Sequence, residues 1–182
     1  MFLNSAYYFI IDQALRSFLA GDDPPSTLTI DTRTGGPYAS ELLAQSQAID
    51  ASHADLTRFA QRGGKFLMLH GTADTSIPTN ASVMYYKMVQ ERMGQEEMDS
   101  FLRFYLIPGF GHARGVFNAG FDALSVLDHW LDTGMAPADL VAVDNNRGSG
   151  GRTRPLCVYP TWPKYKGAGD VNSASSFMCV SE

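Results

Sequence analysis

Several features that would place the chain in a class at once are missing from its sequence. No apolar run approaches the roughly 20 residues that a membrane-spanning helix requires. The opening MFLNSAYYFIIDQ lacks the basic flank and the small-residue cleavage site of a signal peptide. The 14 Lys and Arg are scattered among 19 Asp and Glu, which leaves a net charge of −5. We therefore expect neither a membrane nor a nucleic acid as a partner.

Cysteine and histidine are also scarce. The two cysteines, Cys157 and Cys179, both lie in the last 26 residues, so their simplest use is a clip on the C-terminal tail. Such a clip suits an oxidising compartment. The four histidines show no His-x-x-x-His spacing, so we expect no zinc site and no cofactor.

What the sequence does contain is the pattern of an α/β protein. With 45% hydrophobic and 18% charged residues, its 182 residues suffice for one sizeable core and are short for two. Periodicity predicts helices over 6–20, 35–50, 80–93 and 117–134, a helical turn over 55–64, and buried strands over 65–70 and 101–107. Strand, helix, strand, helix implies parallel strands with crossover helices.

Two finer predictions concern the second half of the chain. In the helix expected over 117–134, the spacing puts four apolar side chains on one face: Phe121, Leu124, Leu127 and Leu131. Beyond residue 136, where proline and glycine become frequent, LVAVD at 140–144 and LCVYP at 156–160 are candidates to pair as edge strands.

An acid and a histidine follow the two predicted strands. Asp74 lies four residues past the first strand and His112 five past the second, in the glycine-rich LIPGFGHARG. Because loops at the carboxyl ends of parallel strands converge, we expect the two side chains to meet. There an aspartate can hold an imidazole in one tautomer and stabilise its charged form. In α/β-hydrolases the catalytic acid and then the histidine follow the serine along the chain, and the acid precedes the histidine here as well. His70, at a strand end, is interpreted as a hydrogen-bonded core histidine.

Three stretches carry a family resemblance. DLTRFAQRGGKFLMLHGTADTSIP, YLIPGFGHARG and RPLCVYPTWPKYKGAGDVNSASSFMC together resemble the tannase and feruloyl esterase family of α/β-hydrolases, and DQALRSFLAGDDP fits more loosely. The resemblance implies a secreted or periplasmic serine hydrolase that cleaves esters of phenolic acids such as ferulate or gallate. It matches Asp74 and His112 to the catalytic acid and base, and it implies a disulfide between Cys157 and Cys179.

The departures from the family pattern concern the nucleophile. The family serine sits in a Gly-Cys-Ser-x-Gly-Gly elbow, and its neighbouring cysteine bonds to one directly after the histidine. Here Ala113 follows the histidine, and no Gly-x-Ser-x-Gly occurs; the nearest match, RGSGG around Ser149, begins with Arg147. We therefore expect the C-terminal part of such an enzyme, with a partial α/β-hydrolase fold and a disulfide-clipped tail. Residues 1–50 would be a remnant of the lid region with linking helices, and 51–182 the C-terminal part of the catalytic domain.

Two functions follow as hypotheses. In a complete enzyme the chain would supply the Asp and His of a Ser-His-Asp triad that acts on a small aromatic ester, while this chain alone would be inactive or nearly so. Alternatively, it is a non-catalytic remnant or accessory interaction module. A dienelactone-type hydrolase or an oligopeptidase tail would share the two loops but would not account for the cysteine-bearing end. Removing central strands would leave an unpaired sheet edge, through which we expect the chain to associate with itself or with a missing half.

Overall fold

The computed structural model describes residues 6–19, 27–31 and 33–181. The chain divides into two compact units, Met1–His53 and Ala54–Glu182, where length alone favoured a single core. Of the predicted elements, residue 20 of the first helix lies outside the described residues, as do residues 1–5 of the opening segment. Within the described residues, no helix combines the length and apolar character that crossing a membrane would require.

The first unit is built from short helices. It contains α1 (Ala6–Phe18), the 3₁₀ turns η1 (Thr27–Thr29) and η2 (Gly36–Tyr38), and α2 (Ala39–Ile49). An ion pair one helical turn apart, from Arg16 Nε to Asp12 Oδ2 at 2.7 Å, supports α1. Both helices lie where periodicity predicted them. The assignment of residues 1–50 to a lid region stays a prediction.

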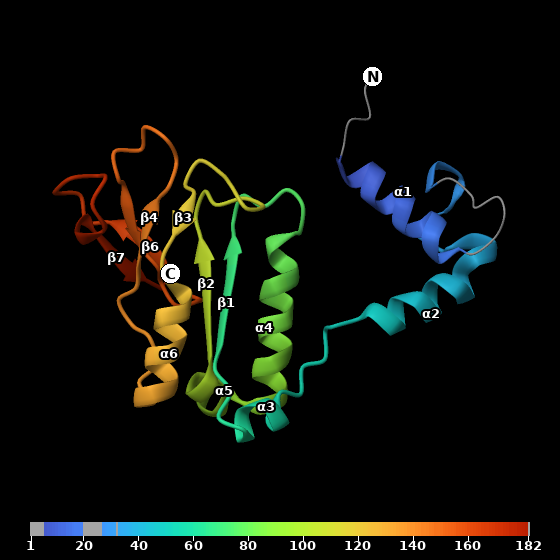
Figure 1. Ribbon diagram of the computed structural model, residues 1–182, viewed down its shortest axis with the longest axis horizontal. Coiled ribbons are helices and arrows are strands. Elements are labelled where there is room, and N and C mark those ends of the chain that lie inside the picture. Colours follow the sequence, from blue (N-terminus) through green and yellow to red (C-terminus); the bar gives the residue numbers. More distant parts are fainter. Residues whose placement is uncertain (1–5, 20–26, 32, 182) are drawn as a thin grey trace. The chain divides into compact units, whose positions relative to one another are not determined.

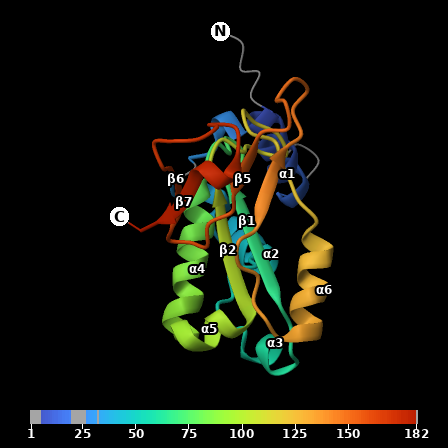
Figure 2. The same ribbon diagram turned by 90° about the vertical axis from the view of Figure 1, so that its left-hand side faces the viewer.

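The second unit is an α/β structure around two parallel strands (Figure 1). Strand β1 (Phe66–Gly71) pairs in parallel with β2 (Leu102–Ile107). The helix α3 (Thr57–Gln61) precedes β1, and α4 (Thr79–Met93) and α5 (Gln95–Phe101) connect the two strands. Helix α6 (Ala123–Thr133) follows β2, and Figures 1 and 2 both show the strand pair between α4 and α6. Among the described residues, β1 has no partner strand at its other edge.

The alternation of side chains along β2 divides the core of this unit. Leu102 and Phe104 belong to a cluster with residues of α4 and α5, while Tyr105 and Ile107 belong to a second cluster. Successive side chains of a strand point to opposite faces, so β2 is covered on both sides. The sequence analysis left 94–100 without an element, and α5 forms there because its buried Met98 contributes to the first cluster.

Helix α6 differs from its prediction in both its start and its buried face. It begins at residue 123, because β3 (Ala119–Gly120) precedes it and the Asp122 carboxylate caps it by accepting the Ser125 N–H. The expected apolar face is buried only in part, since Phe121 packs against the second cluster while Leu124 is 80% exposed and Leu131 54% exposed. The helix is anchored instead by the fully buried Trp130. The long stems of Lys65 and Arg103 bring their cations over its ring, at 5.3 and 5.5 Å from the centroid.

The tail pairs differently from the prediction. Strand β4 (Val141–Asp144) pairs with β3 and with β5 (Thr153–Pro155). Of the expected pairing between 140–144 and 156–160, one bond is formed, from Leu156 N–H to Leu140 O at 2.7 Å. Val158 and Tyr159 lie beside β2, where Val158 is opposite Tyr105 and Tyr159 N–H donates to Phe104 O at 2.7 Å. The reason is aromatic packing, because the Tyr159 ring lies 5.2 Å from Tyr86 and 5.3 Å from Phe104.

The chain ends in an antiparallel hairpin. Strand β6 (Trp162–Tyr165) pairs with β7 (Phe177–Val180), which follows the turn η3 (Ala174–Ser176). The disulfide between Cys157 and Cys179 is present, with 5.5 Å between the Cα atoms, and confirms the expected clip. It ties β7 to the segment that runs beside β2.

Candidate functional site

The loops that leave β1 and β2 are joined by backbone hydrogen bonds. Thr72 N–H donates to Ile107 O, and Ala73 N–H donates to Phe110 O, both at 3.0 Å. These bonds extend the parallel pairing past the strand ends, so residues 72–78 and 108–115 form one structure. We call them the paired loops.

Glycines let the paired loops approach closely. A Cβ built on Gly71 would overlap the backbone carbonyl of Phe110, and one on Gly115 would overlap that of Gly109. Only glycine fits at such contacts without backbone movement. Ala113, directly after the histidine, has a φ of 66°, in the left-handed region that glycine adopts more readily. The bare loop around His112 is therefore folded tightly.

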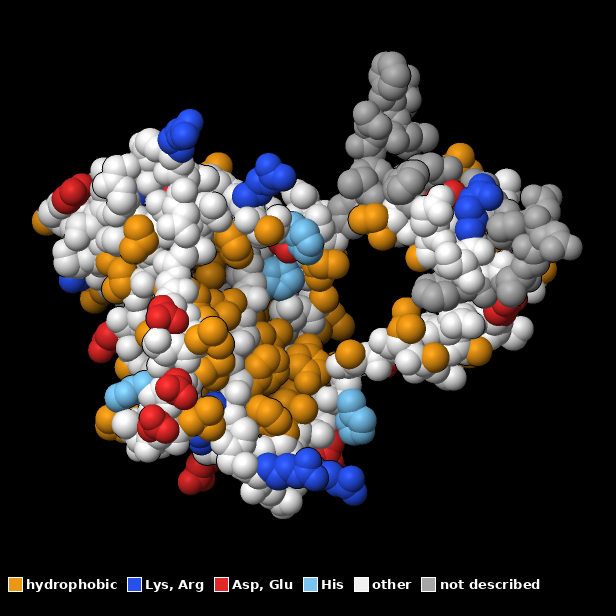
Figure 3. Space-filling view, in the orientation of Figure 1, with side chains coloured by type: hydrophobic (Ala, Val, Ile, Leu, Met, Phe, Trp, Pro, Cys, Tyr) orange, Lys and Arg blue, Asp and Glu red, His pale blue; other side chains and the backbone are white. Residues whose placement is uncertain are grey.

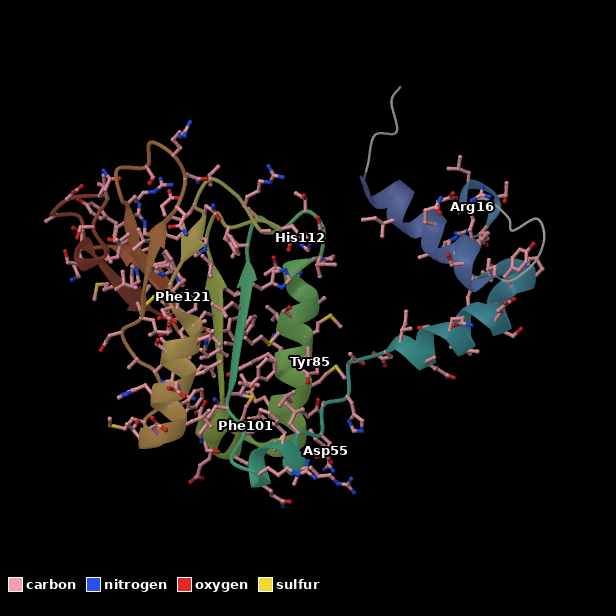
Figure 4. The ribbon with its side chains drawn as sticks, viewed as in Figure 1. Arg16, Asp55, Tyr85, Phe101, His112 and Phe121 are labelled. Carbon is pink, nitrogen blue, oxygen red and sulfur yellow. A yellow bond between two sulfur atoms is a disulfide. The ribbon has the colours of Figure 1, made fainter. Side chains whose placement is uncertain are left out.

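The two predicted residues meet at this point. His112 Nδ1 lies 3.1 Å from Asp74 Oδ2, within hydrogen-bond distance. The Asp74 side chain is 8% exposed and that of His112 62%. Figure 4 shows His112 on its loop beside the end of β1, and Figure 3 shows histidine and acidic side chains gathered at this edge of the unit. No described residue forms a hydrogen bond with His112 Nε2, which leaves this nitrogen open to solvent.

The second oxygen of Asp74 is held by the backbone of its own turn. Oδ1 accepts the N–H groups of Ser76 at 2.7 Å and Ile77 at 2.9 Å. The pKa of Asp74 is lowered from 3.8 to about 2, mainly by the hydrogen bond from Ile77. Burial opposes this shift, while Ser76 and His112 add to it. The carboxylate is therefore ionised at neutral pH and stabilises a positive charge on His112.

His70 is a hydrogen-bonded core histidine, as predicted. Its Nδ1 lies 2.7 Å from Ser82 Oγ and its Nε2 lies 3.1 Å from Ile77 O. Its Nε2 is also 3.5 Å from Asp74 Oδ2, and the side chain is only 9% exposed. The sequence analysis did not connect His70 with Asp74. The available signal was their four-residue spacing across a strand end, which brings both side chains to the same loop.

The described residues supply no nucleophile to His112. Ser149, the nearest match to an elbow, lies in the turn between β4 and β5, where its hydroxyl donates to Asp144 O at 2.8 Å. No described group of three or more His, Cys, Asp or Glu side chains is arranged to hold a metal ion. The site can thus accept a proton at Nε2 of His112 and stabilise the resulting charge, but the atom that gives up that proton is not among these residues.

Comparisons with known proteins identify relatives of this chain. The chain is 38% identical over 169 residues to an uncharacterized esterase, Atu5261, of Agrobacterium fabrum, an alignment that covers 92% of this chain and 31% of the relative. It is 36% identical over 188 residues to a probable feruloyl esterase of Arthroderma benhamiae, covering 96% and 34%. The chain thus spans about a third of the length of these relatives.

A solved structure is also similar to this chain. The crystal structure of feruloyl esterase B from Aspergillus oryzae superposes with a TM-score of 0.67 at 30% identity, covering 78% of this chain and 32% of that one. The family model for tannase and feruloyl esterase matches residues 17–180, which include both the paired loops and the disulfide. The chain therefore belongs to the tannase and feruloyl esterase family.

Proposed function

We propose that this chain supplies the acid and the base of a serine carboxylic ester hydrolase that acts on esters of phenolic acids. The observation that carries the proposal is the 3.1 Å contact between His112 Nδ1 and the buried, ionised Asp74, with Nε2 of the same ring exposed. Membership of the family, and its relatives named as feruloyl esterases, support the substrate class.

The proposed chemistry follows the Ser-His-Asp template. A serine hydroxyl from a segment outside these 182 residues attacks the ester carbonyl as its proton passes to Nε2 of His112. Asp74 accepts the Nδ1–H and stabilises the imidazolium. His112 then gives the proton to the departing alcohol, and an acyl-enzyme remains. A water molecule, deprotonated by the same nitrogen, releases the acid and restores the serine.

The fold supports such a partnership with a further segment. Strand β1 has no second partner among the described residues, so a parallel strand from the nucleophile segment would continue the sheet there. We place the complete enzyme in an oxidising compartment because the tail carries a disulfide.

A second candidate function is an accessory module without esterase activity. The absence of a Gly-x-Ser-x-Gly sequence from the chain favours it.

A chimera tests the proposal. The stretch of Aspergillus oryzae feruloyl esterase B that this chain matches is replaced by this chain, and hydrolysis of methyl ferulate is measured. We expect turnover by the chimera and only background from the 182-residue chain. His112→Ala should lower kcat by about 10⁴-fold.

His129→Ala is the matched control, since His129 is an exposed histidine of α6 away from the paired loops. Turnover by the isolated chain would show that the nucleophile lies within it, and a folded chimera that is inactive would favour the accessory module.

A further inference from the structure

We propose that His70 is a positioning residue for the Asp74–His112 pair, acting through the N–H of its Nε2. This inference rests on the proposed function for its catalytic meaning, although the geometry it predicts can be measured without catalysis. It assigns to the second histidine of the site a task that the triad template does not include.

The hydrogen bonds of His70 determine its tautomer. Ile77 O is a carbonyl oxygen and can only accept, so the Nε2 that lies 3.1 Å from it carries the hydrogen. A neutral imidazole then has a lone pair on Nδ1, which accepts the Ser82 hydroxyl at 2.7 Å. His70 is thus held between α4 and the Asp74 turn with its Nε2–H directed toward the turn.

That donor faces the carboxylate that orients His112. Nε2 of His70 lies 3.5 Å from Asp74 Oδ2, the same oxygen that lies 3.1 Å from His112 Nδ1. Ile77 is held from both sides, because its N–H donates to Asp74 Oδ1 and its C=O accepts from His70. The bonds therefore run without interruption from Ser82 through His70, Ile77 and Asp74 to His112.

The burial of His70 separates this role from direct catalysis. Its side chain is 9% exposed, and both ring nitrogens already have partners, so neither nitrogen is open to a substrate. Its effect must pass through Asp74. A substitution that removes the N–H at the position of Nε2 also removes the hydrogen bond to Ile77 O. Asp74 is then no longer held in one orientation toward His112.

Two amide substitutions test the role of each ring nitrogen. In His70→Gln the side-chain amide nitrogen reaches the position of Nε2 and can donate to Ile77 O. In His70→Asn the shorter amide reaches only the position of Nδ1, near Ser82. Both variants are polar and of similar size, so they carry a similar risk to folding. The readout is the ¹H–¹⁵N NMR spectrum of the imidazole groups in the 182-residue chain, which reports the tautomer of neutral His112.

We expect His112 to carry its proton on Nδ1 in the unsubstituted chain and in His70→Gln, and to lose that preference in His70→Asn. In the active chimera, His70→Asn should lower kcat by about 10- to 100-fold with little change in KM, the effect of a small misplacement of catalytic groups. His70→Gln should restore most of kcat.

Other outcomes overturn the inference. If both variants keep the Nδ1–H form of His112, His70 does not position the pair; if both lose it, the ring acts by packing and not through its N–H. If His70→Asn alone keeps the Nδ1–H form, the pair is positioned through the contact between Nδ1 of His70 and Ser82, not through Nε2. Failure of the proposed function looks different, since the chimera would then be inactive while the His112 tautomer still depended on residue 70.

Discussion

The paired loops and the C-terminal tail of the second unit are held in place by different means. In the paired loops, backbone hydrogen bonds and close glycine contacts fix the orientation of Asp74 and His112. In the tail, residues 153–180, half of the side chains of β6 and β7 are exposed, and this hairpin is held by a disulfide and by Arg154, which lies 4.2 Å from the centre of the Phe177 ring. Many directional bonds give the precision that proton transfer requires, whereas a covalent link keeps a hairpin without fully buried side chains attached.

The largest effect should come from breaking the contact within the paired loops. Asp74→Asn removes the negative charge and allows an amide N–H to face His112, so the imidazole is held in the wrong tautomer. We expect kcat for methyl ferulate in the chimera to fall by about 10⁴-fold. Asp128→Asn, at an exposed position of α6, is the control. A loss of less than tenfold would contradict the role of Asp74.

Removing the covalent link should affect the tail and spare the loops. In the double variant Cys157→Ser, Cys179→Ser, the unfolded chain regains the entropy of a 22-residue separation. The free energy of unfolding should fall by about 3 kcal/mol, measured by urea denaturation. The NMR signal of His112 should not move. A changed His112 tautomer would show that the tail and the loops are not independent.

Crowding the paired loops should be costly even without touching a catalytic group. Gly71→Ala places a Cβ against the backbone carbonyl of Phe110, which cannot rotate away. We expect a loss of about 1–3 kcal/mol in unfolding free energy, together with reduced turnover in the chimera. Gly120→Ala is the matched control, because its Cβ meets only the side-chain amide of Asn145. Equal losses in the two variants would argue against a special contact at Gly71.

Acid should weaken the paired loops in a defined range of pH. The pKa of Asp74 is 3.8 in its ordinary state and about 2 in the folded chain. Its ionised form therefore contributes stability that is present above pH 3.8 and lost as the pH falls toward 2. Urea denaturation between pH 5 and pH 2 should show a smaller decline in Asp74→Asn than in the unsubstituted chain. Parallel curves would mean that this carboxylate is not preferentially ionised in the folded state.

The smallest effect is expected at Ala113. Its φ of 66° is unfavourable for alanine and free for glycine, but glycine also gains entropy in the unfolded chain. The two terms oppose each other, so Ala113→Gly should change the unfolding free energy by less than about 1 kcal/mol. A thermal melt can measure this change, and a large destabilisation would show that the Ala113 methyl group packs against the loop.

Much of the second unit was predictable because its strands and helices have strong patterns. The apolar runs at 65–70 and 101–107 correspond to β1 and β2, and the helix expected over 80–93 corresponds to α4. The meeting of Asp74 and His112 followed from one rule, that the carboxyl ends of adjacent parallel strands lie together.

Other features depended on partners that periodicity does not reveal. An apolar face of α6 was predicted from the spacing of Phe121 and three leucines, but Trp130 is fully buried while Leu124 remains exposed. Residues 156–160 were expected to pair with 140–144, but beyond the bond between Leu156 and Leu140 the segment lies beside β2, where Tyr159 packs against Phe104. Local sequence could not choose between these arrangements, because each choice depends on residues far away in the chain.

The sequence by itself determined the parallel strands, the acid and the histidine that follow them, and the pair of cysteines, since these depend on local pattern and chain order. Only the tertiary structure decided that His70 faces the same carboxylate as His112 and that Gly71 lies against Phe110. Such contacts require distances of a few ångströms between different elements, and those distances are set by how the whole unit packs.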